Sequence, residues 1–132
     1  MTEIKQSTWC VPWAIAFVTG KTPNEIADLI KEERGDGRPV RGVCQLHYLA
    51  VLRGALGVKI TATVRFPGMT IRKWAANRAK WGDKSTWLVM NSGHMMVYRA
   101  GVIYDNASPT GLPAPIHKYA GARLRDAWQV SL

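Results

Sequence analysis

The chain has 132 residues, and its 18 Lys and Arg against nine Asp and Glu give a formal net charge of +9. A hydrophobic fraction of 47% excludes a disordered chain, and the length suits one domain over residues 1–132. The two cysteines are too few for a disulfide framework, and no apolar run is long enough to cross a bilayer. Residues 1–20 lack the charged, apolar and small-residue order of a secretory signal. We therefore expect a cytoplasmic protein with free thiols and no membrane partner.

The first part of the chain is expected to be helical. A first helix is predicted over about residues 8–20, because Pro12 is accommodated only in a first helical turn and Gly20 ends the pattern. This start places Cys10 at the N-terminal end of the helix. A second helix is predicted to start at Thr22 and a third to span about residues 43–56.

The second part of the chain is expected to form an antiparallel sheet. Apolar residues alternate or cluster in short runs of strand length, with one helical stretch among them. Prolines interrupt the pattern after residue 108, and the segment from Tyr119 to Leu132 has only a weak pattern. Helices followed by a sheet indicate an α+β fold. The expected strands are 58–64, 87–90, 95–98 and 102–104, and the expected helix is 70–80.

Cys10 is a candidate nucleophile because of its place at a helix N-terminus. A thiol must ionise before it reacts, and the unpaired N–H groups of a helix N-terminus favour the thiolate. The alternative is that Cys10 is simply a buried core residue, since free cysteine packs like a small hydrophobe.

His94 is a candidate base because it begins a predicted hairpin that also contains an acidic residue. With a two-residue turn at Arg99–Ala100, Asp105 lies directly opposite His94; with the turn at Ala100–Gly101, Asp105 is diagonal to His94 on the same face. A three-residue loop would instead place Asn106 opposite His94. Either partner could orient the imidazole so that its other nitrogen takes the thiol proton.

Two stretches of the sequence resemble the papain-like cysteine peptidase superfamily, and in particular small phage- and plasmid-borne papain-like proteins. One stretch is Cys10-Val11-Pro12-Trp13-Ala14-Ile15-Ala16-Phe17-Val18-Thr19-Gly20. The other is Gly93-His94 followed by Gly101-Val102-Ile103-Tyr104-Asp105. The resemblance covers about residues 6–108 and implies a nucleophile helix packed on a C-terminal antiparallel sheet.

The resemblance implies a thiol hydrolase that cleaves an amide or isopeptide bond in a protein or peptide. Cys10 would be the nucleophile, His94 the base and Asp105 the orienting residue. Independently of the resemblance, this reaction needs donors for an oxyanion, and the candidates are the Cys10 N–H and the side chain of Gln6, four residues before it; in the alternative, Gln6 is a solvated N-terminal residue. Such a reaction needs no cofactor and no metal. The charge of +9 suggests an acidic partner, such as an acidic substrate, or an anionic surface. Acyl transfer is an alternative, because the same three residues serve both reactions.

A different class of function is a catalytically silent papain-like fold that serves as a virion component or binds nucleic acid. Basic residues with interleaved tryptophans over residues 53–84 could contact phosphates and stack on bases. In the alternative, Ile71, Trp74 and Ala75 are core residues and the basic groups form a solvated helix face. The candidate binding residues are Arg72, Lys73, Arg78 and Lys80.

Two further groups have weaker claims to a role. Cys44 and His47 have a spacing that can ligate metal, but no second pair exists, so we predict no metal site. His117 lies in a proline-rich stretch where the sequence identifies no partner for it.

Overall fold

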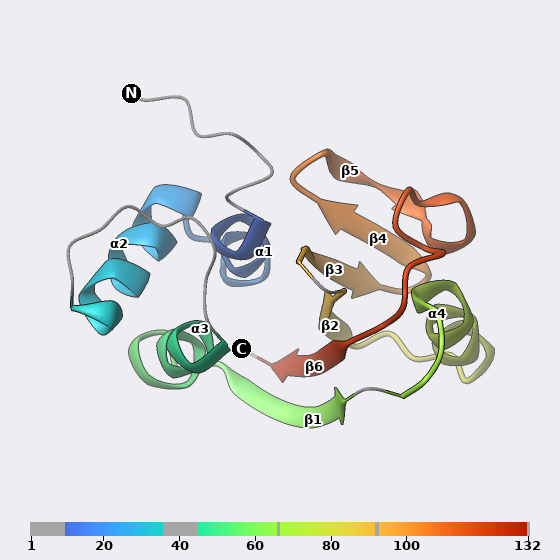
Figure 1. Ribbon diagram of the computed structural model, residues 1–132, viewed down its shortest axis with the longest axis horizontal. Helices are drawn as coiled ribbons and strands as arrows, with labels where there is room; N and C mark the ends of the chain where they lie inside the picture. The colour runs from blue at the N-terminus through green and yellow to red at the C-terminus, as the bar shows by residue number, and fades with distance from the viewer. Residues whose placement is uncertain (1–9, 36–44, 66, 92, 132) are drawn as a thin grey trace.

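The computed structural model describes residues 10–35, 45–65, 67–91 and 93–131, which form four α-helices and a six-stranded antiparallel sheet (Figure 1). Helices α1 (Cys10–Thr19), α2 (Pro23–Arg34) and α3 (Gln45–Ala50) come first, and α3 continues into the π-helical segment η2 (Val51–Ala55). Helix α4 (Ile71–Lys80) follows the first strand. The α+β class expected from the sequence is therefore confirmed.

The sheet has the strand order β1-β6-β2-β3-β4-β5, and every neighbouring pair is antiparallel. A short 3₁₀ helix, η3 (Ala114–Ile116), connects β5 to the loop before β6. The strands are β1 (Lys59–Arg65), β2 (Thr86–Met90), β3 (Met95–Arg99), β4 (Val102–Asp105), β5 (Ser108–Pro113) and β6 (Asp126–Ser131).

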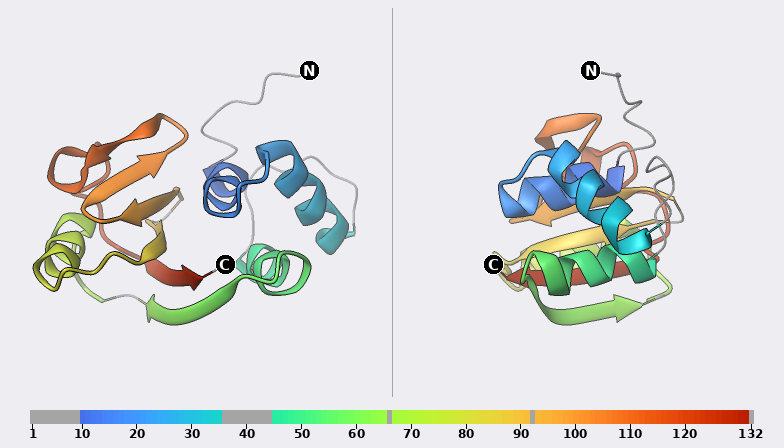
Figure 2. Two further views of the ribbon diagram at one scale, coloured as in Figure 1. Left: turned by 180° about the vertical axis from the view of Figure 1, so that it is seen from behind. Right: turned by 90° about the vertical axis from the view of Figure 1, so that its left-hand side faces the viewer.

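Helices cover both faces of the sheet and bury a separate apolar cluster on each. Figures 1 and 2 show α1, α2 and α3 together on one side and α4 on the other. The α4 side buries Trp74 against Trp87 and Tyr98, with each pair of ring centroids 5.2 Å apart. The other cluster joins α1, α2 and α3 to Leu88, Val97 and Trp128 of the sheet.

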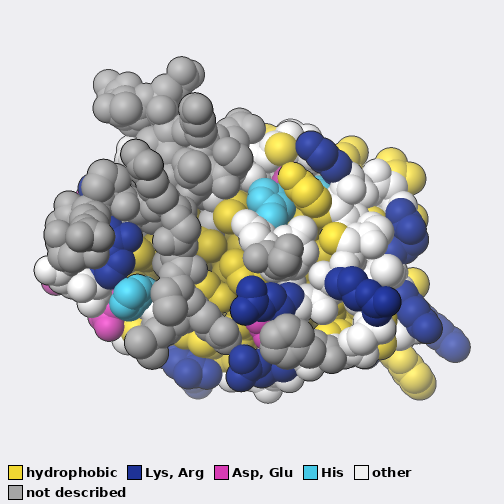
Figure 3. Space-filling model, viewed as in Figure 1, with side chains coloured by type: hydrophobic (Ala, Val, Ile, Leu, Met, Phe, Trp, Pro, Cys, Tyr) yellow, Lys and Arg dark blue, Asp and Glu magenta, His cyan; other side chains and the backbone are white. Residues whose placement is uncertain are grey.

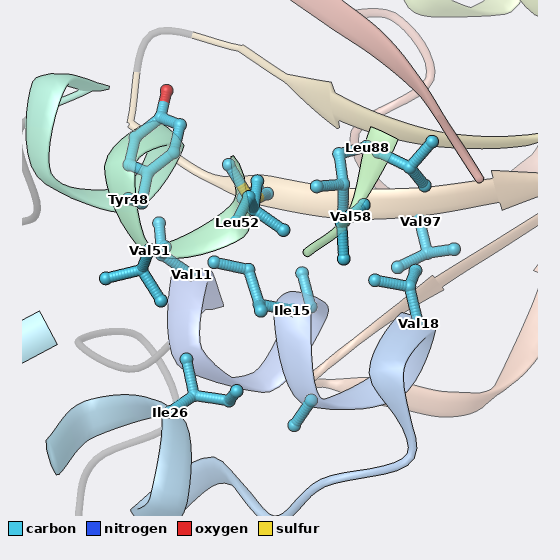
Figure 4. Close-up of a cluster of buried hydrophobic side chains, with 14 of the residues drawn as sticks. Val11, Ile15, Val18, Ile26, Tyr48, Val51, Leu52, Val58, Leu88 and Val97 are labelled. Carbon is cyan, nitrogen blue, oxygen red and sulfur yellow. The ribbon is translucent and has the colours of Figure 1, made fainter. Parts of the chain in front are cut away.

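Helix α1 is buried around most of its circumference because it lies between α2 and the sheet. Seven of its ten residues are buried, which is typical of a helix inside a core rather than at a surface. Figure 4 shows Val11 and Ile15 of α1 facing the side chains of η2 and Val58, and Val18 beside Val97 of β3. This packing fixes the position of Cys10, the first residue of the helix.

Two strands correct the expectations for the C-terminal part. Strand β5 forms despite Pro109 and Pro113 because it is an edge strand that pairs only with β4, where proline is tolerated. Strand β6 lies between β1 and β2 inside the sheet. Four of its first five residues are buried, so it lacks the alternation that marks a half-exposed strand.

The third predicted helix lies at the expected position, but only its first part is α-helical and its second part is π-helical. Residues 43 and 44 lie outside the described residues, and the α-helical turns end at Ala50. Beyond that point Leu56 N–H donates to Val51 O at 3.0 Å, the wider spacing of a π-helix. Gly54 in this turn lowers its α-helical propensity.

Candidate active site

Cys10 opens α1 at the point where the helix meets the sheet. Its side chain is buried, and Sγ lies 3.9 Å from the carbonyl oxygen of Gly93, a residue 83 positions later in the chain. The first N–H groups of a helix have no partner within the helix and point towards its N-terminal end. The thiol is thus held where backbone dipoles favour its ionised form.

The turn between β2 and β3 is shaped by Asn91, a residue that the sequence analysis did not single out. Its Oδ1 accepts from the N–H of Gly93 at 2.9 Å and from the N–H of His94 at 2.8 Å. Its own N–H donates to His94 O at 3.1 Å. An Asn two residues before a Gly between two strands was the available signal, because Asn side chains often satisfy the backbone of such turns. Asn91 therefore holds the backbone from which the imidazole projects.

The β3–β4 hairpin brings His94 and Asp105 together in one of the predicted registers. Ala100 (φ 49°) and Gly101 (φ 87°) form the turn, with the two positive φ values that a type I′ turn requires. Arg99 pairs with Val102, so Asp105 is diagonal to His94 on the same face. His94 Nε2 lies 2.9 Å from Asp105 Oδ2.

Asn106, the alternative partner for His94, does not fill that role. The three-residue loop that would have placed it opposite His94 does not form. Its side chain is buried, and neither amide atom has a hydrogen-bond partner within the described part of the chain.

The Asp105 carboxylate is surrounded by N–H groups. Oδ1 accepts from Ser108 N–H at 2.6 Å, and Oδ2 faces His94 Nε2 at 2.9 Å and His117 Nε2 at 3.4 Å. Burial raises the pKa of Asp105, but the His94 bond, the charge interaction with His117 and the Ser108 bond together lower it below its ordinary value. The carboxylate is therefore ionised at neutral pH.

Cys10 and His94 perturb one another in the direction of an ion pair. Burial opposes charge on both groups and is the largest single influence on each. Hydrogen bonds and charge interactions with Asp105 and Cys10 nevertheless raise the pKa of His94 to about 9. Bonds with His94 and with the Met95 backbone lower the pKa of Cys10. Because His94 Nε2 is engaged by Asp105, the Nδ1 side of the ring is left for the thiol.

His117 and Tyr119 complete the surroundings of His94, and neither was assigned a role from the sequence. The Tyr119 ring lies 4.6 Å from the His94 ring and 6.0 Å from the His117 ring, between centroids. Both residues follow η3, so their approach to the hairpin depends on how β5 and η3 fold back. No local sequence signal could have found this contact.

Two residues considered from the sequence have no described position. Gln6 and Cys44 lie outside the described residues, which leaves the Cys10 N–H as the one proposed oxyanion donor with a known position. Within the described ranges, no group of three or more His, Cys, Asp or Glu side chains has the arrangement of a metal site.

The basic residues predicted for nucleic-acid contact lie on α4, and its apolar residues are core residues. Arg72, Lys73 and Lys80 are exposed, whereas Arg78 is half-buried and interacts with Asp83. Ile71, Trp74 and Ala75 are buried, as the alternative predicted. Trp81, which follows the helix, is 77% exposed.

Positive charge is concentrated in the sheet half of the molecule. Residues 45–131 contain twelve Lys or Arg and three Asp, whereas residues 10–35 contain three Lys or Arg and four Asp or Glu. All three Asp of the sheet half are engaged: Asp83 by Ser85 and Trp87, Asp105 by two histidines, and Asp126 by Arg65 and Arg125. The space-filling view shows many Lys and Arg side chains on this half and little acidic surface (Figure 3).

Comparisons with known proteins identify no family for this chain. No protein-family model, no curated protein and no solved structure matches this chain. Among the described residues, no helix has the length and apolar character needed to span a membrane.

Proposed function

We propose that this chain is a papain-like thiol hydrolase that cleaves an amide bond through Cys10, His94 and Asp105. One observation supports the proposal above all: a single imidazole contacts a buried carboxylate at 2.9 Å and also the thiol that opens a buried helix. A structural core needs none of these groups, because burying them costs free energy that apolar side chains would not. Groups with perturbed pKa values that converge in this way are typical of functional sites.

The reaction follows from the roles of the three residues. The Cys10 thiolate attacks the substrate carbonyl carbon, and the Cys10 N–H stabilises the oxyanion that forms. Protonated His94 gives its proton to the leaving amine as the C–N bond breaks, which leaves a thioester on Cys10. Neutral His94 then removes a proton from water, whose oxygen attacks the thioester and releases the acid and the thiol. Asp105 orients the ring and stabilises its charged form.

The distribution of charge favours an acidic protein or peptide as substrate. All three carboxylates among described residues 45–131 are engaged by neighbouring donors, and these residues have an excess of nine Lys and Arg over Asp. Such a field raises the rate at which an oppositely charged partner arrives, and salt screens it. Cleavage of an acidic substrate should therefore slow as ionic strength rises.

Cleavage of a complex peptide mixture tests the proposal. Wild-type protein and the Cys10→Ala variant are incubated with such a mixture, and new peptide ends are counted by mass spectrometry. We expect new ends with the wild type alone, enriched next to Asp and Glu. Identical patterns for the two proteins, together with an ordinary alkylation rate for Cys10, would refute a hydrolase. New bonds to added amines instead of free acids would indicate acyl transfer.

The exposed face of α4 favours a second function, the binding of nucleic acid by a non-catalytic module. Trp81 is 77% exposed and is adjacent in sequence to Lys80. Proteins that bind single-stranded nucleic acid use an exposed aromatic ring to stack on a base and a basic side chain to contact a phosphate. Salt-dependent binding of an oligonucleotide that Trp81→Ala weakens and Cys10→Ala leaves unchanged would support this function.

A further inference from the structure

His117 is a buried histidine that the proposed chemistry does not use. Its side chain is 1% exposed, and Nδ1 accepts from the backbone N–H of Tyr119 at 3.1 Å. A ring nitrogen that accepts cannot also bear a proton, so the neutral ring has its proton on Nε2. The local backbone thus selects one tautomer of His117.

The protonated nitrogen of His117 points at the carboxylate that serves His94. Nε2 of His117 lies 3.4 Å from Asp105 Oδ2, the same oxygen that His94 Nε2 approaches at 2.9 Å. At the longer distance Nε2 makes no well-formed hydrogen bond to any described residue. A buried N–H without a strong bond is costly, and Asp105 is the acceptor within reach. Two imidazoles therefore compete for one oxygen.

The two histidines differ in which groups face them. His94 faces Cys10 from α1 and Asp105 from β4, and both partners favour its charged form. His117 faces Asp105 and His94, and burial together with the charge on His94 outweighs Asp105 and lowers the pKa of His117. The Tyr119 ring lies beside both histidines, with Lys118 Nζ 5.5 Å from its centroid on the solvent side. One carboxylate thus supports one cation, His94.

We propose that His117 is a positioning residue of this site, an imidazole whose protonated Nε2 lies 3.4 Å from Asp105 Oδ2 and limits how strongly the carboxylate holds the proton of His94. The inference rests on the proposed function, because it assigns His117 a role in tuning His94. A carboxylate that shares its charge with a second donor is a weaker acceptor for the first. His117 thereby keeps His94 able to release its proton to the leaving amine.

Nitrogen-15 NMR of the imidazole rings tests the tautomer in the wild-type protein. At pH 7 to 8 we expect His117 to be neutral with its proton on Nε2, because its pKa is lowered from 6.5, while His94 has protons on both nitrogens. A doubly protonated His117 at neutral pH, or a neutral ring with its proton on Nδ1, would overturn the proposal. This measurement needs no substitution and does not depend on whether the protein turns over a substrate.

Alkylation of Cys10 with a charged and an uncharged reagent tests the effect on His94. Iodoacetate reacts best beside a charged imidazole, whereas iodoacetamide responds to the thiolate alone, so the ratio of the two rates follows the charge of His94. In the wild type this ratio should fall with a midpoint near the His94 pKa of about 9. In His117→Leu the midpoint should rise by roughly half to one pH unit, because Asp105 loses a neutral donor.

Matched variants separate this effect from a loss of structure. His117→Gln can place an amide N–H near the position of Nε2 and should restore the wild-type midpoint. His47→Gln makes a comparable change at a histidine outside the site and should leave the midpoint unchanged. An unmoved midpoint in His117→Leu, or an equal shift in His117→Gln, would overturn the proposal. If wild-type Cys10 instead reacts like an ordinary thiol, the proposed function fails, and the NMR result still decides the tautomer of His117.

Discussion

Asp105→Asn is expected to slow the alkylation of Cys10 at pH 7 by roughly tenfold, because it removes the charge that supports His94. Burial disfavours the charged ring, yet interactions with Asp105 and Cys10 raise the pKa of His94 from 6.5 to about 9. This increase corresponds to about 3 kcal/mol at about 1.4 kcal/mol for each pH unit. If the two partners contribute equally, each supplies at least half of this net increase because burial opposes both, so the loss of Asp105 removes at least about 1 to 2 kcal/mol, which is the basis of the tenfold figure.

The assay measures the rate of iodoacetamide reaction at each cysteine from pH 5 to 9. Tryptic peptides 6–21 and 42–53 separate Cys10 from Cys44, so Cys44 serves as an internal reference. His94→Ala should slow Cys10 more than Asp105→Asn does, because it removes the ring itself. Asp83→Asn is the matched control, since Asp83 accepts from Ser85 and Trp87 away from the site.

Three patterns of rates would contradict this role of Asp105. If folded Asp105→Asn reacts within twofold of the wild type across the pH range, the carboxylate does not support the imidazole. If Asp83→Asn slows Cys10 equally, the effect is a general loss of stability. A larger effect from Asn106→Ala would mean that Asn106, and not Asp105, governs His94.

Three further predictions concern stability. Trp74→Ala should lower the free energy of unfolding, measured in urea, by about 3 to 5 kcal/mol, because it removes a buried ring with two aromatic neighbours. Trp81→Ala should change this free energy little, because Trp81 is exposed. Equal losses in the two variants would contradict the packing. Gly111→Ala should cost about 1 to 3 kcal/mol and lower the Tm, since φ is +87° and the new Cβ would lie 2.6 Å from two side chains of β4; an unchanged Tm would contradict this. The stabilisation from the raised pKa of His94 is complete below pH 6.5 and is lost as the pH rises through about 9. The stabilisation from the lowered pKa of Cys10 depends on pH in the opposite way: it is complete above pH 9.0 and is lost as the pH falls. Cys10→Ala should therefore lose stability more steeply than the wild type between pH 6.5 and 9, and equal slopes would argue against the ion pair.

Local patterns in the sequence were sufficient to predict most helices and strands and two features of the site: the position of Cys10 at a helix N-terminus and the proximity of His94 to Asp105. Pro12 limits where α1 can begin and so placed Cys10 at a helix N-terminus. The short turn between β3 and β4 allowed few registers, and two of the three considered join His94 to Asp105. These predictions succeeded because the interactions involved span a few residues and depend on backbone geometry alone. The strand β6 was not predicted, because burial on both faces removes the alternation that identifies a strand.

Tertiary structure alone decided which groups meet at the site and what charge they bear. Cys10 lies beside Gly93, which is 83 positions later in the chain, and no periodicity in the sequence encodes this contact. His117 reaches Asp105 because β5 and η3 fold back over the hairpin, although its local sequence offers no partner. The pKa values of Cys10, His94 and His117 depend on burial and on neighbours from separate elements. The sequence by itself determined the residue types available for this chemistry, whereas long-range packing determined their distances, and charge interactions depend on distance and burial.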